Sequence, residues 1–175
     1  MRLIYGKINE TYSDESVVGR ALLLAALCDE GISVTADDVV KDSLGKPYLP
    51  DRVGVEFNIT HKNGFVACVL SMGEGRVGID AEPSEGALKE SHVERFSKKY
   101  FSENEIEALK LKRRSFSEIW TRKEAYLKWV GTGLATDLRE VDTCRIPKNV
   151  RFETLFAEEH VITVCLAADA ELVKI

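Results

Sequence analysis

Apolar and polar positions alternate along this chain in a way that divides it into short strands and amphipathic helices. The segment "RLIYGKI" (2–8) alternates weakly and predicts an opening strand, and "SVVGRALLLAALCDEG" (16–31) predicts a helix that ends at Gly31. Further on, "VEFNITHKNGFVACVLSMGEG" (55–75) contains two runs rich in β-branched and aromatic residues, joined by the turn "KNG". We expect a hairpin there, preceded by the turn-rich connection "DSLGKPYLPDRVG" (42–54).

The second part of the chain repeats this arrangement. A further apolar run, "RVGIDAEP" (76–83), is followed by helical patterns at about 85–99, 103–112 and 115–130. The segment "VRFETLFAEEHVITVCLAAD" (150–169) then has the same order as the first hairpin: an apolar run, a polar turn and an alternating run. We predict an α+β fold of two similar halves, 1–76 and 77–175, with a ligand cleft at the seam between them.

Composition and charge narrow the functional classes. The chain has 175 residues, of which 45% are apolar and 30% charged, as is typical of a globular protein. Its net charge of −5 argues against a general nucleic-acid-binding protein, because such proteins need a broad basic surface. The longest apolar run, "ALLLAALC" (21–28), is too short to cross a membrane, and the first residues lack the pattern of an export signal. We therefore expect a cytoplasmic protein with no membrane or nucleic-acid partner.

The four cysteines favour no metal centre. Cys28, Cys68, Cys144 and Cys165 are scattered and lack C-x-x-C spacing, and three of them lie in apolar runs. We expect reduced residues of the core rather than disulfides or zinc ligands.

Two carboxylates, Asp80 and Glu82, stand at the end of an apolar run that Pro83 closes. Side chains alternate across a strand, so the two acids should project from one face while Ile79 and Ala81 point into a core. An ordinary strand exit would account for this pair, because Asp, Glu and Pro favour turns. Two like charges side by side also favour a divalent cation such as Mg²⁺, and that interpretation requires a third ligand elsewhere in the chain.

The segment "SFSEIWTRKEAYLKWVGTGL" (115–134) offers such a ligand on a helix. Glu124 and Lys128 lie four residues apart on one flank of an apolar stripe, and Gly131 is well placed as the left-handed residue that ends the helix. A plain surface ion pair between Glu124 and Lys128 is the alternative. Lys123 falls within the stripe itself, where a lysine must extend to the surface or contact an anion. The stripe consists of Phe116, Ile119, Trp120, Tyr126, Leu127 and Val130.

One further motif precedes this helix. In "YFSENEIEAL" (100–109), Ser102 stands three residues before Glu105, the spacing of a capping box. We interpret the pair as helix capping and nothing more.

Three motifs together resemble a known family. "VGIDAEP", "FSENE" and "WTRKEAYLKWVGTGL", in this order and at this separation, resemble the signatures of the 4′-phosphopantetheinyl transferases of the single-chain, two-lobed type, the surfactin-synthetase-activating (Sfp-like) enzymes. "GRALLLAAL", "GKPYLP" and "FNITH" fit upstream family elements, so the resemblance covers nearly the whole chain. It implies two pseudo-symmetric α/β lobes with the active site between them. It also implies Mg²⁺-dependent transfer of the phosphopantetheine arm of coenzyme A to a serine of an acyl or peptidyl carrier protein.

The resemblance also implies roles for individual residues. Asp80, Glu82 and Glu124 would hold Mg²⁺, or Mn²⁺, against the diphosphate of coenzyme A. Lys128 would contact the phosphate on which charge develops, and Lys123 would lie near it. Glu124 would also be the candidate base for the incoming serine, directly or through water, although a tight metal ligand is a poor base.

Recognition of the 3′-phosphate of coenzyme A would fall to the N-terminal lobe. The matching residues are Arg20, Lys46, Thr60 and His61, which supply two cations, a hydroxyl and an imidazole. Each of them also has an ordinary structural explanation when it is taken alone.

The chain departs from the family pattern at three points. Ala81 stands where the family usually has a larger aliphatic residue, and "NITHK" replaces the commoner "NISHS", so that Lys62 adds a charge beside the nucleotide site. The chain is also shorter than typical two-lobed members. None of these differences removes a catalytic group.

Partner and competing functions follow from the same residues. Carrier proteins are acidic, so we expect docking through cations near the helices, in "FSKKYF" and "KLKRRS", among them Arg113 and Arg114. Cations at helix ends are the alternative explanation. The competing functions are a catalytically silent coenzyme A or nucleotide-binding protein and a metal-dependent phosphohydrolase. Because duplicated halves complete one cleft, we expect a monomer.

Overall fold

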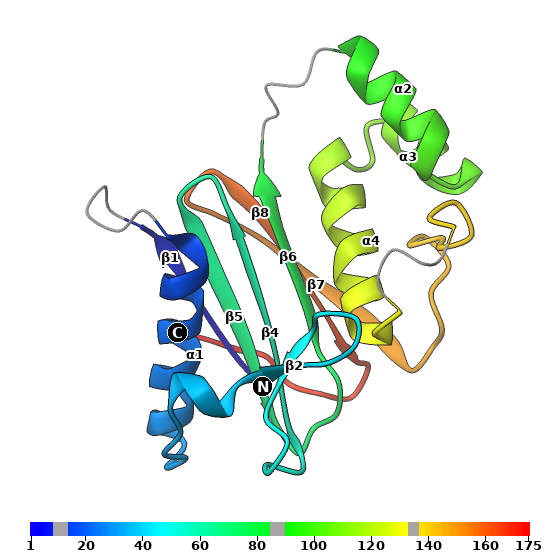
Figure 1. Cartoon of the computed structure of the whole chain (residues 1–175). Coiled ribbons are helices and arrows are strands. Elements are labelled where there is room, and N and C mark those ends of the chain that lie inside the picture. The colour runs from blue at the N-terminus through cyan, green and yellow to red at the C-terminus, as the bar shows by residue number, and fades with distance from the viewer. Residues whose placement is uncertain (9–13, 85–89, 133–136) are drawn as a thin grey trace.

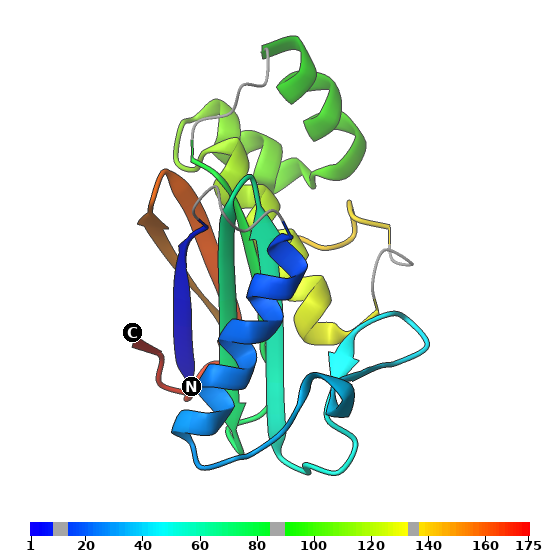
Figure 2. The same ribbon diagram turned by 60° about the vertical axis from the view of Figure 1, so that its left-hand side comes forward.

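The protein has four layers, with two sheets packed between two helices (Figure 1). The computed structural model describes residues 1–8, 14–84, 90–132 and 137–175. Helix α1 (Glu15–Asp29) covers the outer face of the first sheet, and helix α4 (Phe116–Val130) covers the outer face of the second sheet (Figures 1 and 2). Among the described residues, no helix is both long and apolar enough to pass through a membrane.

The first half contains the opening strand, a long helix and a hairpin. Strand β1 is Arg2–Lys7, helix α1 is Glu15–Asp29, and β4 (Val55–Lys62) and β5 (Phe65–Met72) form the hairpin. Between α1 and β4 lie a short 3₁₀ helix, η1 (Ala36–Asp38), and the two-residue strands β2 (Val40–Lys41) and β3 (Pro47–Tyr48). The predicted strand, helix and hairpin are confirmed, and Gly31 has a left-handed φ of 76° just past the helix.

The second half contains the acidic strand, three helices and the second hairpin. Strand β6 is Gly78–Pro83, and the helices are α2 (Glu90–Tyr100), α3 (Glu103–Lys110) and α4 (Phe116–Val130). The hairpin strands are β7 (Val150–Ala157) and β8 (His160–Ala167), and β9 (Val173–Lys174) ends the described elements. The three helices and the hairpin are thus confirmed, although the expected start of the first helix falls at 85–89, outside the described residues.

Both halves have the same topology. In each, a first strand is followed by the covering helix and a hairpin, and the second hairpin strand pairs with the first strand: the orders are β4-β5-β1 and β7-β8-β6. In both sets of three strands, each strand runs antiparallel to its neighbour. Strand β9 departs from this symmetry, because it pairs in parallel with β1 and so adds an element of the second half to the first sheet. The division at residue 76 remains a prediction.

The main core lies between the two sheets. Its largest cluster joins Leu3, Phe65 and Val69 of the first sheet to Ile79 and Ile162 of the second. The expectation that Ile79 and Ala81 point into a core is confirmed, since both belong to this cluster. The cysteines are free, as expected, but only Cys68 and Cys165 are buried, so the prediction of a core position is wrong for Cys28 and Cys144.

Helix α4 lies very close to β6, and Gly78 permits this contact. A Cβ atom at this position would lie 2.0 Å from the carbonyl oxygen of Ala125 and 2.6 Å from the amide nitrogen of Trp129. Both are backbone atoms of α4, so the helix as a whole would have to move.

We expect Gly78→Ala to lower the free energy of unfolding by about 1–3 kcal/mol, because the added methyl group overpacks this contact. Gly6→Ala is the matched control, since Gly6 also lies in a strand and no atom of the described residues beyond its chain neighbours lies within 4 Å of the added Cβ. Urea unfolding measures both variants. Equal unfolding midpoints for the two would contradict the close contact as a source of stability.

Candidate active site

Asp80 and Glu82 lie on the face of β6 that looks toward α4. Their register partners on β8 are Thr163 and Val161. The hydroxyls of Thr163 and Thr121 of α4 are 2.8 Å apart, which places this face of the sheet against the helix. The prediction that the two acids project together, opposite Ile79 and Ala81, is therefore confirmed.

Asp80 is nearly buried, at 7% exposure, and receives donors from both halves. Its Oδ1 accepts from Lys128 Nζ of α4 at 2.7 Å and from Thr60 Oγ1 of β4 at 3.3 Å. Its Oδ2 is buried and has no hydrogen-bond partner among the described residues. Burial raises the pKa of Asp80 above its ordinary value, and the charge of Lys128 opposes this effect.

Glu124 lies on α4 one turn before Lys128, and the two do not form the surface ion pair that was the alternative. Instead, Lys128 Nζ contacts Asp80 and donates to the carbonyl oxygen of Ile79 at 2.9 Å. Partial burial raises the pKa of Glu124, and the negative charge of Asp80 raises it further. Asp80, Glu124 and Lys128 thus interact electrostatically with one another where α4 packs on β6.

Glu82 contacts a cation from the other half. Its Oε1 lies 3.1 Å from Lys62 Nζ of β4. Among the described residues, no three His, Cys, Asp or Glu side chains are arranged closely enough to hold a metal ion. Lys128 and Lys62 each hold one of the β6 carboxylates, while Glu124 has no ion pair among the described residues.

Lys123 does not reach the cleft, so the prediction that it lies near the phosphate and helps to bind coenzyme A does not hold in this structure. Its side chain has no exposed surface, and its ammonium lies 2.8 Å from Glu105 Oε2 of α3. It also donates to the carbonyl oxygens of Leu138, at 2.6 Å, and Val141. A lysine within the apolar stripe needs an anionic partner, and for Lys123 this partner is Glu105.

Glu105 also does more than cap a helix, which corrects the interpretation of "FSENE". The capping box with Ser102 is present, with Ser102 N donating to Glu105 Oε2 at 2.8 Å. The other oxygen accepts from the amide and the hydroxyl of Thr143 at 2.9 and 2.6 Å. One carboxylate thus joins α3, α4 and the segment around Thr143.

Sequence reasoning missed a line of polar contacts between the halves. Asn58, Thr60 and Lys62 alternate along β4, and each contacts β6: Asn58 Oδ1 accepts from Ile79 N at 3.1 Å, Thr60 donates to Asp80, and Lys62 pairs with Glu82. The period of two in "NITHK" was the available signal, because it places these three side chains on one face. This period could not show that β6 lies next to β4 in the folded protein.

The four residues expected at the 3′-phosphate are brought together only in part. Thr60 faces Asp80, whereas His61 points to the other face of β4, where its Nδ1 lies 2.9 Å from Glu15 Oε2. Arg20 lies on α1, which covers that face. Lys46 lies in the connection before β3 and pairs weakly with Glu56 at 3.7 Å.

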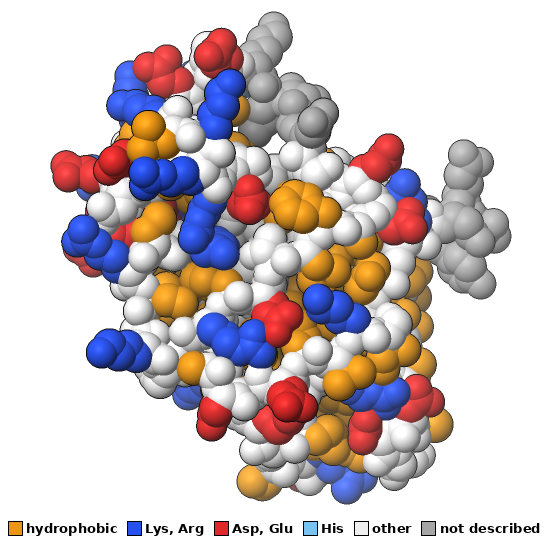
Figure 3. Space-filling model, turned by 180° about the vertical axis from the view of Figure 1, so that it is seen from behind, with side chains coloured by type: hydrophobic (Ala, Val, Ile, Leu, Met, Phe, Trp, Pro, Cys, Tyr) orange, Lys and Arg blue, Asp and Glu red, His pale blue; other side chains and the backbone are white. Residues whose placement is uncertain are grey.

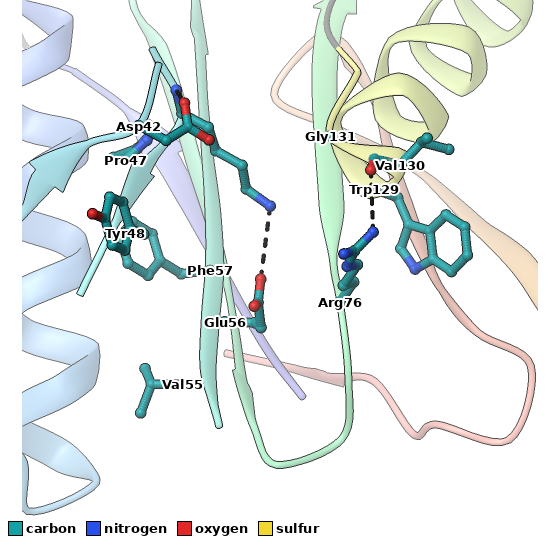
Figure 4. Close-up of a pocket in the computed structure, with 11 residues that line it drawn as sticks. Asp42, Pro47, Tyr48, Val55, Glu56, Phe57, Arg76, Trp129, Val130 and Gly131 are labelled. Carbon is teal, nitrogen blue, oxygen red and sulfur yellow. Dashed lines mark hydrogen bonds and ion pairs between the residues drawn. The ribbon is translucent and has the colours of Figure 1, made fainter. Parts of the chain in front are cut away.

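Two neighbouring cavities adjoin this site, and both halves line them. One cavity of about 300 Å³ has Lys46, Asn58, Glu124 and Lys128 in its wall. The other, of about 250 Å³, shares Lys46, Pro47 and Gly131 with it. Figure 4 shows the second cavity, with residues of the first half facing the end of α4, where Arg76 donates to the carbonyl oxygen of Val130 at 3.2 Å. The cleft predicted between the halves is thus present.

Comparison with known proteins identifies the family. Residues 76–172, more than half of the chain, match the model of the 4′-phosphopantetheinyl transferase superfamily. The chain is 34% identical over 114 residues to 4′-phosphopantetheinyl transferase HetI of Nostoc sp., covering 61% of this chain and 46% of that protein. It is 29% identical over 137 residues to 4′-phosphopantetheinyl transferase gsp of Aneurinibacillus migulanus, covering 74% and 53%. For 4′-phosphopantetheinyl transferase Sfp of Bacillus subtilis the identity is 31% over 99 residues, covering 54% and 41%.

The chain spans about half the length of these curated relatives. The family match includes β6 with Asp80 and Glu82, and α4 with Glu124 and Lys128. The resemblance found in the three sequence motifs is thus confirmed, and this chain belongs to the 4′-phosphopantetheinyl transferase superfamily.

Proposed function

We propose that this protein transfers the 4′-phosphopantetheine arm of coenzyme A to a serine of an apo carrier protein, acyl or peptidyl. The observation that carries the proposal is Asp80. Its carboxylate is buried, and one oxygen has no partner within the described ranges. The other oxygen accepts from Lys128, which lines a cavity with Glu124. A buried acceptor of this kind, next to a second carboxylate, fits a site that takes a cation and a phosphate group.

In the proposed reaction, the serine oxygen attacks the phosphorus that carries the pantetheine arm. A new phosphorus–oxygen bond joins the arm to the carrier, and the bond to the bridging oxygen of the diphosphate breaks. Adenosine 3′,5′-bisphosphate leaves with that electron pair. We expect Lys128 to neutralise charge on the phosphoryl oxygens, because its ammonium contacts Asp80 and the residue lines the same cavity as Glu124.

The residues that would hold Mg²⁺, or Mn²⁺, are Asp80, Glu82 and Glu124. The free Oδ2 of Asp80 and the oxygen-only donor set fit a hard divalent cation. When bound, the cation would supply positive charge against the diphosphate oxygens. Glu124 is also the candidate acceptor for the serine proton, directly or through water, and its raised pKa supports this role.

Coenzyme A would occupy the cavities between the halves. Lys46 lies in the wall of both cavities and is the best-placed cation of the first half for a phosphate of the nucleotide. We retain Arg20 and His61 as candidate 3′-phosphate ligands, and we assign Thr60 to the support of Asp80. Since both halves line the cleft, one chain is sufficient for it, and we propose a monomer.

The test is the intact mass of an apo carrier protein after incubation with this protein, coenzyme A and Mg²⁺. Transfer adds about 340 Da to the carrier, and a chelator should prevent it. No gain with several carrier types, while coenzyme A still binds, would favour a silent binding protein. Release of adenosine 3′,5′-bisphosphate without any carrier would favour a phosphohydrolase.

Cations at the start of α4 are the proposed contact for an acidic carrier. Ser117 Oγ of α4 donates to the carbonyl oxygen of Pro83 at 2.7 Å, so this end of the helix lies where β6 ends beyond Glu82. Lys112 and Arg113 are exposed just before it, whereas Arg114 is half-buried. In the view from behind (Figure 3), several lysine and arginine side chains lie on the side that carries α2, α3 and α4, with acidic side chains among them.

We expect Arg113→Glu to raise the KM for the carrier about fivefold while the KM for coenzyme A stays within about twofold, because only the carrier meets this surface. Lys174→Glu on β9 makes the same charge change at an exposed position and serves as the control. Steady-state kinetics with each substrate varied in turn measures both. An unchanged KM for the carrier would remove Arg113 from the docking surface.

A further inference from the structure

Lys62 is a cation of the first half that reaches the acidic strand of the second. Its Nζ lies 3.1 Å from Glu82 Oε1, and about half of the lysine side chain is exposed. The contact joins the ends of β4 and β6, next to the one between Thr60 and Asp80. Lys62 is therefore a polar contact of the candidate site itself and not an isolated surface charge.

The backbone that carries Lys62 is held in place. Its carbonyl oxygen lies 3.2 Å from Nε2 of His160, a buried residue of β8. The imidazole stacks on Phe65 with ring centroids 4.5 Å apart. The turn that follows, Asn63 and Gly64, has positive φ angles of 50° and 76°, as a tight two-residue hairpin requires. The backbone of Lys62 is thus held in place, and its side chain extends from there to Glu82.

The charge of Lys62 extends beyond Glu82. It lowers the pKa values of Asp80 and Glu124, although burial has the larger effect on both and raises them. All three carboxylates therefore experience this ammonium. A positive charge in this position opposes a divalent cation in two ways, by repulsion and by occupying an oxygen of Glu82.

We propose that Lys62 is a resident counter-ion that holds Glu82 away from the metal position, so that a divalent cation must displace it, and that Lys62 thereby weakens metal binding. This inference rests on the proposed function, because it takes Asp80, Glu82 and Glu124 as the metal ligands. It assigns Lys62 a positioning role toward Glu82.

The test is direct binding of Mn²⁺ to the full chain without coenzyme A, measured from the signal of free Mn²⁺ in electron paramagnetic resonance. Replacing Lys62 by Ser or by Gln should tighten Mn²⁺ binding about fivefold, since the competing partner and its repulsion are both lost. Lys62→Arg keeps the charge and should bind Mn²⁺ as the wild type does. Lys98→Ser removes an exposed lysine on α2 and controls for net charge.

The outcomes separate this inference from the proposed function. If Asp80→Asn abolishes Mn²⁺ binding while both neutral variants of Lys62 bind it no more tightly than the wild type, the role of Lys62 is wrong and the metal site stands. If Mn²⁺ binding does not depend on Asp80, the metal site itself is wrong and the inference fails with it.

Discussion

Asp80→Asn should reduce the rate of arm transfer about a thousandfold, equivalent to about 4 kcal/mol of transition-state stabilisation. The substitution keeps the shape of the side chain and removes the charge that faces Lys128 at 2.7 Å. It also changes the free Oδ2 into an amide or a neutral carbonyl, both poor ligands for Mg²⁺. The rate is measured as the initial gain in carrier mass at saturating coenzyme A.

Asp137→Asn is the control for Asp80→Asn, because Asp137 is exposed and, within the part of the chain that the structure describes, its ion pair is with the nearby Arg139. The control should transfer the arm at close to the wild-type rate. Thermal unfolding checks that Asp80→Asn is folded. A folded Asp80→Asn protein with a rate within tenfold of the wild type would contradict the role of Asp80 in the reaction.

Lys123→Met should have the largest effect on stability, about 3–5 kcal/mol in the free energy of unfolding. The variant leaves the carboxylate of Glu105 fully buried without its cation, and it removes the donor to the carbonyl oxygens of Leu138 and Val141. Burial lowers the pKa of Lys123, because it disfavours the charged ammonium. The contact with Glu105 and other negative charge nearby oppose this effect. The charge of Lys123 therefore depends on Glu105. Urea unfolding measures the change through the midpoint and the slope.

Two further variants show whether the loss comes from the ion pair. Lys98→Met removes an exposed lysine that pairs with Glu94 on α2, and its free energy of unfolding should stay close to the wild-type value. The double variant Lys123→Met with Glu105→Gln should lose less stability than the sum of its single variants, because the uncompensated charge is gone. If the free energy of unfolding of Lys123→Met lies within about 1 kcal/mol of the wild-type value, the buried pair of Lys123 and Glu105 is not a main source of stability.

Much of the fold could be predicted because its signals are local. Each hairpin consists of two apolar runs and a turn of two residues, and both turns, at Asn63–Gly64 and Glu158–Glu159, have the positive φ angles that such turns need. Helix α4 ends at Gly131, whose φ is 83°, as its sequence predicts. The strand β9 was not predicted, since its two residues gain order only by pairing with β1.

The candidate site could be predicted in its residue types but not in its pairings. The period of two placed Asp80 and Glu82 on one face of a strand, and the helical period placed Glu124 and Lys128 on one flank. The family resemblance placed Lys123 near the phosphate, and the capping spacing left Glu105 as a cap. Their partnership joins residues of different helices, and no local period encodes such a contact.

The sequence by itself determined the family, the main helices and hairpins, and the proposal that Asp80, Glu82, Glu124 and Lys128 form the site. Local hydrogen bonding, side-chain alternation and turn chemistry act over a few residues, so they can be read along the chain. Only the tertiary structure decided that Lys128 holds Asp80 rather than Glu124, that Lys62 holds Glu82, and that Lys123 is buried with Glu105. The reason is physical: a buried or half-buried charge takes the nearest opposite charge in space, and that distance is set by how the two sheets and their helices pack.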